Sequence, residues 1–197
     1  MIETSNDGVA ATSANRTPVY EIKARDSRLT VQAFAEGLFS SFGHNPKLTT
    51  REFGGTVSFN RDHPEQSALE FFVKADSLKV TDDVSEKDRG EIERMMKEEV
   101  LETSRFSEIT FRSKSVSANR IYEGFYRVNI TGELTLHGVT RDHSIDTQVR
   151  VMEDGLRAEG DSTLRQSDFG IKKVSVAGGT LKVKDEVKLT FLIVAGK

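Results

Sequence analysis

The chain has 197 residues, an ordinary length for one domain, of which 36% are hydrophobic and 30% charged. Its formal net charge is only -3, and Lys and Arg are spread along the sequence, so the basic patch of a nucleic-acid-binding protein is missing. Because there is no cysteine, disulfides, thiolate metal sites and a cysteine nucleophile are excluded. No apolar segment is long enough to cross a bilayer as a helix.

Residues 1–18 are rich in Thr, Ser, Asn and Ala and show no apolar periodicity. We therefore expect a flexible tail over residues 1–18 and one domain over residues 19–197. The tail does not resemble a secretory signal, because no basic segment precedes an apolar one. The sequence as it stands predicts a cytoplasmic protein, and a leader removed from the chain would instead make it periplasmic.

The domain is expected to begin with two strands, Val19–Arg25 and Arg28–Ala35, joined as a hairpin by a tight turn at Asp26-Ser27. The glycine-flanked segment Gly37–Pro46 then breaks the alternation of apolar and polar residues. We expect this segment to cross one end of a barrel as a loop or short helix. It is a candidate functional rim.

A single amphipathic helix is predicted between Asp82 and Leu101, after strands at Thr56–Asn60 and Ala68–Lys79. Its apolar residues recur near the spacing of one helix face: Ile92, Met95, Met96 and Val100. One helix among many strands is expected to pack this face over an open end of a barrel.

Strict alternation is clearest from Tyr126 to Leu136, where apolar or glycine residues occupy every second position. Ile145–Val151 and Val187–Ile193 repeat the pattern. No long helix separates most of these strands, which argues against parallel βαβ units. The predicted fold class is therefore all-β, an antiparallel sheet closed into a barrel.

Several segments match one known family in order and spacing. The clearest is the hairpin Asn129–Arg141, with the sequence NITGELTLHGVTR. The others are Phe53–Phe59, Ala68–Val80, Phe106–Ser113, Ser167–Ile171 and Val187–Val194. Together they resemble the YceI-like lipid-binding family over about residues 19–195.

The resemblance implies an extended, lipocalin-like, eight-stranded antiparallel β-barrel with the helix near one mouth and a long apolar lumen. It also implies an apolar small-molecule partner: an isoprenoid quinone, a polyisoprenoid or a fatty-acid-like lipid. No other cofactor, no metal, no nucleic acid and no membrane span are expected, and a homodimer is one possible assembly.

Phenylalanine is the dominant aromatic residue, with 12 Phe against 3 Tyr and no Trp. Inward Phe rings would give a lumen broad apolar contact with few polar groups. Strand pattern alone favours a packed core, whereas the resemblance favours an open lumen. The predicted wall residues are Phe59, Phe71, Val73, Phe111, Val128, Ile130, Leu134 and Phe191, and the predicted mouth residues are Phe39, Phe42, His44, Met95 and Met96.

The four histidines show no helical metal-ligand spacing, and no Gly-x-Ser-x-Gly motif is present, so no catalytic residue is assigned. His63 and His137 are expected on the surface, while His143 shares the parity of Ile145 and is expected near a barrel mouth. His44 is the histidine best placed to hydrogen-bond a lipid headgroup.

Binding, carriage or sequestration of an apolar chain, without catalysis, is the predicted function. One alternative is a hydrolase or isomerase that acts on a lipid-like substrate with His44 as the base. Another is a solidly filled barrel that binds a second protein through its surface or rim.

Overall fold

The computed structural model describes residues 17–36, 45–172, 175–176 and 181–197. Its strands are β1 (Val19–Ile22), β2 (Arg28–Gln32), β3 (Ala35–Glu36), β4 (Lys47–Thr49), β5 (Phe53–Ser58), β6 (Ala68–Lys74), β7 (Lys79–Val80), β8 (Glu108–Tyr122), β9 (Phe125–Leu136), β10 (Val139–Val151), β11 (Gly155–Arg165), β12 (Ser175–Val176), β13 (Leu181–Val183) and β14 (Glu186–Gly196). Its helices are α1 (Glu86–Met95), a π-helical continuation (Met96–Val100), and the 3-10 turns η2 (Pro64–Gln66), η3 (Ala75–Ser77) and η5 (Gln166–Phe169).

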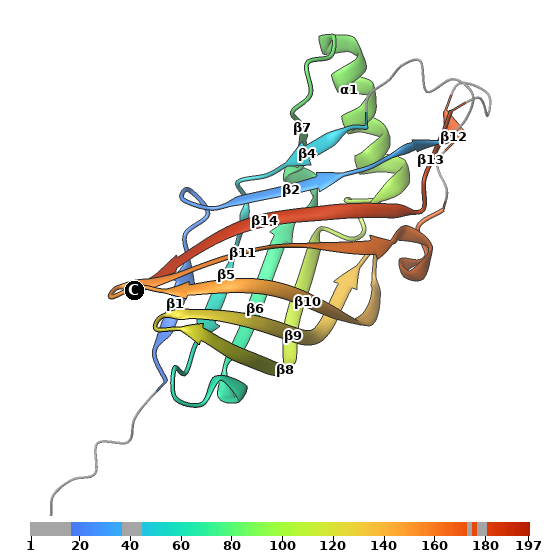
Figure 1. Ribbon diagram of the computed structural model, residues 1–197. Coiled ribbons are helices and arrows are strands. Elements are labelled where there is room, and N and C mark those ends of the chain that lie inside the picture. Colours follow the sequence, from blue (N-terminus) through green and yellow to red (C-terminus); the bar gives the residue numbers. More distant parts are fainter. Residues whose placement is uncertain (1–16, 37–44, 173–174, 177–180) are drawn as a thin grey trace, which may run out of the picture.

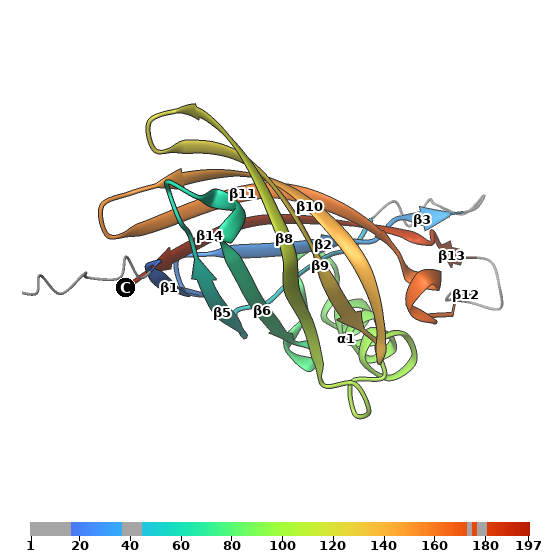
Figure 2. The ribbon, with the colours of Figure 1, turned by 90° about the horizontal axis from the view of Figure 1, so that it is seen from below.

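Eight antiparallel strands close into a barrel in the order β1-β5-β6-β8-β9-β10-β11-β14, and β14 pairs back onto β1. The predicted all-β barrel is confirmed, and the described residues contain a single α-helix. The long strands β8 to β11 curve around it, and the β8–β9 and β10–β11 hairpin turns project at one end, beside the C-terminus (Figure 2). We call this the hairpin end.

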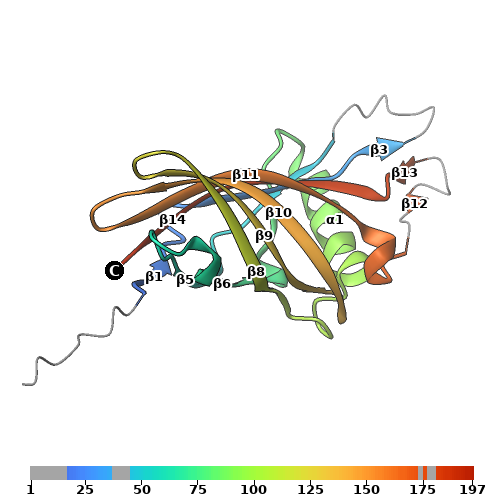
Figure 3. The same ribbon diagram turned by 60° about the horizontal axis from the view of Figure 1, so that its bottom comes forward.

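The opposite end carries α1, η5 and the turn between β9 and β10 (Figures 1 and 3). We call it the helix-covered end. Here β2, β4 and β7 extend the sheet from β14, and α1 packs beside β7. Ser85 caps α1, because its hydroxyl oxygen accepts a hydrogen bond from the Asp88 N–H at 3.1 Å.

The predicted hairpin between β1 and β2 is wrong. Both strands pair antiparallel with β14, β1 at Ile22–Ala195 and β2 at Leu29–Phe191, so they run in the same direction and cannot form a hairpin. Buried Ser27 joins them: its hydroxyl donates to the Lys23 carbonyl at 2.7 Å and accepts from the Val194 N–H at 2.9 Å. The turn at Ser27 therefore does not reverse the chain. Instead, β2 follows β1 along the same edge of β14.

Strand β5 begins at Phe53, ahead of the predicted start at Thr56, so Gly54 and Gly55 lie inside it. Gly55 has φ of 143°, and a Cβ there would lie 2.0 Å from the Glu70 carbonyl oxygen of β6. Only glycine permits this approach of two backbones. The predicted strand Ala68–Lys79 is not continuous, because the 3-10 turn η3 interrupts it.

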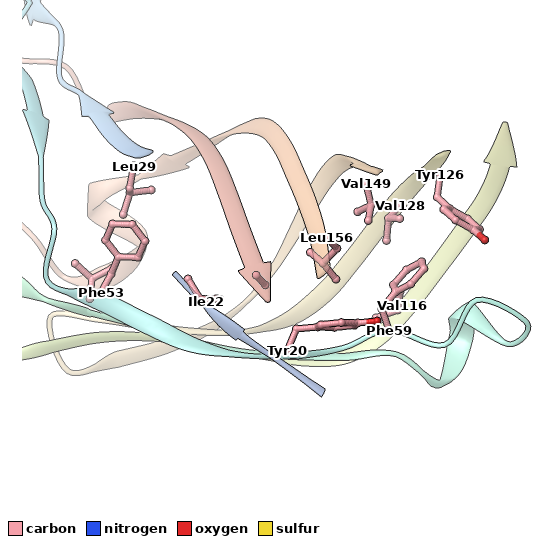
Figure 4. Close-up of a cluster of buried hydrophobic side chains, with 12 residues drawn as sticks. Tyr20, Ile22, Leu29, Phe53, Phe59, Val116, Tyr126, Val128, Val149 and Leu156 are labelled. Carbon is pink, nitrogen blue, oxygen red and sulfur yellow. The ribbon is translucent and has the colours of Figure 1, made fainter. Parts of the chain in front are cut away.

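The interior divides into clusters of buried side chains. In Figure 4, Val128, Val149 and Leu156 on one wall point toward Tyr20 and Phe59 on the other. At the helix-covered end, Met96 packs with Leu48, Leu78 and Val80. The inward residues of β9 are those that alternation predicted, since Tyr126, Val128, Leu134 and Leu136 are all buried.

Candidate functional site

The barrel encloses a cavity of about 190 Å³ whose lining comes from all eight barrel strands and from β2. Most lining residues are apolar, and no Lys or Arg of the described chain is among them. All eight predicted wall residues lie along it: Phe59, Phe71, Val73, Phe111, Val128, Ile130, Leu134 and Phe191. Strand parity places them there, and their contact with a ligand stays a prediction.

The size of the cavity limits what enters it without rearrangement. Its volume of about 190 Å³ exceeds the roughly 150 Å³ that admits a benzene-sized guest, but it is below the roughly 300 Å³ of a typical ligand pocket. A short apolar chain therefore fits directly. A longer chain requires lining side chains to change rotamer.

Two phenylalanine rings of the lining, Phe59 and Phe71, are held by neighbouring aromatic rings that do not themselves line the cavity. Phe59 meets Tyr126 edge-on with ring centroids 5.2 Å apart, and Phe53 meets Phe71 at 5.7 Å. Gly160 on β11 leaves room for a further ring, because a Cβ there would lie 2.9 Å from the Phe191 ring. The lumen thus offers flat, adaptable apolar surfaces to a hydrocarbon.

His143 on β10 and Ser162 on β11 form a polar pair within this lining. The His143 Nε2 and the Ser162 Oγ are 2.7 Å apart. Burial lowers the pKa of His143 below its ordinary value of 6.5. Ser162 was not among the predicted site residues, although it shares the inward parity of Leu164 and could have been found from it.

Of the predicted mouth residues, the structure describes only Met95 and Met96. Phe39, Phe42 and His44 lie outside the described residues. Met96 is buried in the cluster under the helix and is absent from the cavity lining, so its place at the mouth stays a prediction. Met95 is half-buried and is also absent from the lining.

His137, which was predicted on the surface, is instead held at the helix-covered end; that prediction is wrong. Its side chain is 13% exposed, with Nε2 2.9 Å from a Glu102 carboxylate oxygen and Nδ1 3.3 Å from the Phe169 carbonyl oxygen. The Phe106 ring packs 4.6 Å from the imidazole. We call Glu102, His137 and Phe169 the end tie, because it joins three separate segments.

The imidazole of the end tie also affects the acid beside it. The hydrogen bond from His137, followed by that from Arg105, holds the pKa of Glu102 below its ordinary value of 4.5. His63 is on the surface as predicted, with a side chain 62% exposed.

Within the described parts of the chain, no group of three or more His, Asp or Glu residues is arranged to hold a metal ion. None of the described helices is long and apolar enough to cross a membrane.

The sequence model of the YceI-like domain matches residues 20–195. The chain belongs to the YceI-like family. The family resemblance drawn from the sequence is thereby confirmed. Among curated relatives, a UPF0312 protein of Pseudomonas savastanoi pv. phaseolicola is 31% identical over 139 residues, covering 68% of this chain and 67% of the relative. Protein YceI of Escherichia coli O157:H7 is 29% identical over 133 residues, covering 63% and 62%.

Solved structures share the YceI-like fold at low sequence identity. BcnA of Burkholderia cenocepacia superposes with a TM-score of 0.66 at 15% identity, over 88% of this chain and 98% of that one. A polyisoprenoid binding domain from Saccharophagus degradans superposes with a TM-score of 0.64 at 16% identity, over 90% and 97%. These similarities establish the shared barrel.

Proposed function

We propose that this YceI-like protein binds an apolar chain, such as an isoprenoid or another lipid, inside the lumen, and that it carries or sequesters the chain without altering it. The observation that supports this most directly is the cavity of about 190 Å³ with its mainly apolar lining. The Saccharophagus degradans structure, a polyisoprenoid binding domain with the same fold, supports the same class of ligand.

The energetics of the lining suit such a ligand. Each buried CH₂ contributes about 0.8 kcal/mol, so a five-carbon isoprene unit contributes roughly 3 to 4 kcal/mol before the entropy cost of ordering the chain. A few units are therefore enough for tight binding. The alternative of a solidly filled barrel is disfavoured by the cavity, and the hydrolase alternative requires His44, which lies outside the described residues.

Phe71 and its neighbour Phe72 provide a matched test, because Phe71 lines the cavity whereas Phe72 is 39% exposed on the opposite face of β6. A Phe71→Arg variant places a charge without a partner in the lumen, so we expect lipid affinity to fall roughly a hundredfold or more. Phe72→Arg should bind as the wild type does. Affinity is measured with a fluorescent isoprenoid on protein shown by circular dichroism to be folded.

Mass spectrometry of an organic extract of the purified protein identifies the natural ligand. Equal binding by wild type and a folded Phe71→Arg variant would contradict binding in the lumen.

A further inference from the structure

Two polar side chains interrupt an otherwise apolar stretch of the lumen. His143 and Ser162 lie on neighbouring strands, both line the cavity, and their side chains share a 2.7 Å hydrogen bond. Placing an imidazole and a hydroxyl in an apolar lining costs free energy that valine or leucine would not cost. The position therefore calls for a role beyond filling the wall.

Two of the other hydroxyls along the cavity hydrogen-bond to the backbone. Thr147 donates to the Glu159 carbonyl at 3.0 Å, and the Ser67 oxygen accepts from the Asn60 N–H at 3.1 Å. The bond between His143 and Ser162 occupies one imidazole nitrogen and one function of the hydroxyl. It leaves the pair with capacity both to donate and to accept a further hydrogen bond.

The electrostatic character of this place is neutral. Burial lowers the pKa of His143, which favours the uncharged imidazole at neutral pH. No Lys or Arg of the described chain lines the cavity. A phosphate or carboxylate on the lumen side of His143 would have no counter-charge in the lining, because Arg141 and Arg165 lie along a separate polar recess that His143 also borders.

We propose that His143 and Ser162 bind the polar end of the lumen ligand, and that this end is an uncharged hydrogen-bonding group such as an alcohol, a phenol or a carbonyl. The proposal rests on the proposed function of the lumen and adds the class of headgroup and the direction of the chain. His143 pairs with Gly132, toward the helix-covered end, whereas Val149 pairs with Tyr126, toward the hairpin end. The tail therefore runs toward the hairpin end, with roughly 20 Å of β10 between His143 and Val149 along which to lie.

Three ten-carbon probes test this, since the cavity admits a short chain directly. Geraniol carries a hydroxyl, myrcene is a hydrocarbon of similar skeleton, and geranyl phosphate carries an anion. Dissociation constants are measured by calorimetry for the wild type, Ser162→Ala, His143→Gln, and a double variant with Ser162→Ala and His143→Leu. Ser144→Ala and Thr163→Val are matched controls, because both residues are exposed on the same two strands.

In the wild type, geranyl phosphate should bind at least roughly tenfold more weakly than geraniol at pH 7.5. In the double variant, the ratio of the geraniol to the myrcene dissociation constant should rise roughly tenfold, because the buried hydroxyl loses its partners. Ser162→Ala should produce part of this rise. His143→Gln keeps a hydrogen-bonding group, so it should raise the ratio less than the double variant does. The control variants should leave the ratio unchanged.

A second readout separates ligand contact from a purely structural bond. The ¹⁵N resonances of the His143 imidazole should shift when geraniol is added and stay in place with myrcene. An unchanged ratio in the double variant, or phosphate binding as tight as alcohol binding, would overturn the headgroup proposal. If neither geraniol nor myrcene binds the wild type, the proposed function of the lumen fails instead.

Discussion

The helix-covered end and the lumen differ in how completely their side chains satisfy one another. At the helix-covered end, Met96 is packed among buried apolar residues, and His137 has an oxygen acceptor at each ring nitrogen. In the lumen, a cavity remains open, and His143 uses only Nε2 in a hydrogen bond to Ser162. The difference indicates that the side chains of the helix-covered end stabilise the barrel, whereas the lumen leaves volume and hydrogen-bonding capacity for a ligand.

The two histidines make this difference specific. Both ring nitrogens of His137 lie within hydrogen-bonding distance of an oxygen atom, Nε2 of the Glu102 carboxylate and Nδ1 of the Phe169 carbonyl, so His137 is committed to the end tie. His143 faces a hydroxyl, which donates or accepts as required. Substitutions at the end should therefore change stability, and substitutions in the lumen should change ligand selectivity.

The largest effect on stability is expected from Met96→Ala. This change empties a filled site beneath the helix, among Leu48, Leu78 and Val80, and should lower the free energy of unfolding by about 3 kcal/mol. Urea denaturation measures the loss. Binding of geraniol by the folded fraction should stay within roughly twofold of the wild type, and a strong change would show that the helix and the lumen are coupled.

A smaller loss of about 2 kcal/mol is expected from His137→Ala, because it removes the hydrogen bonds to the Phe169 carbonyl and to Glu102 together with the contact with Phe106. Urea denaturation again gives the value. His63→Ala is the control, since His63 is an exposed histidine and should cost little. Equal stability of the two variants would show that the end tie contributes nothing.

The smallest effect is a difference in pH dependence between the two regions. Since burial lowers the pKa of His143, the unfolded chain takes up its proton at a higher pH, and the folded state loses stability as the pH falls below about 6.5. The pKa of Glu102 is also lowered, so its contribution is present above about 4.5 and is lost as the pH falls below that value.

Thermal unfolding between pH 4 and 8 separates these contributions. His143→Gln should flatten the profile below about pH 6.5, and Glu102→Gln should flatten it only below about pH 4.5. If both variants changed the same pH window, the distinction between lumen and end would fail.

Local pattern was sufficient for the strands and for the direction of their side chains. Val128 and Leu134 face inward because a strand alternates its two faces. The same rule failed at His137, which lies in a turn with φ of 52° just beyond β9, where alternation no longer applies. Its partners, Glu102 and Phe169, come from distant segments that a local pattern does not connect.

By itself, the sequence determined the class of fold, the inward set of apolar residues and the position of the amphipathic helix, because alternation and helical spacing act between near neighbours in the chain. Tertiary structure alone decided that β1 and β2 lie end to end along β14, that His143 and Ser162 meet, and that the barrel retains a cavity. These features depend on which distant strands pair and how completely their side chains fill the space between them.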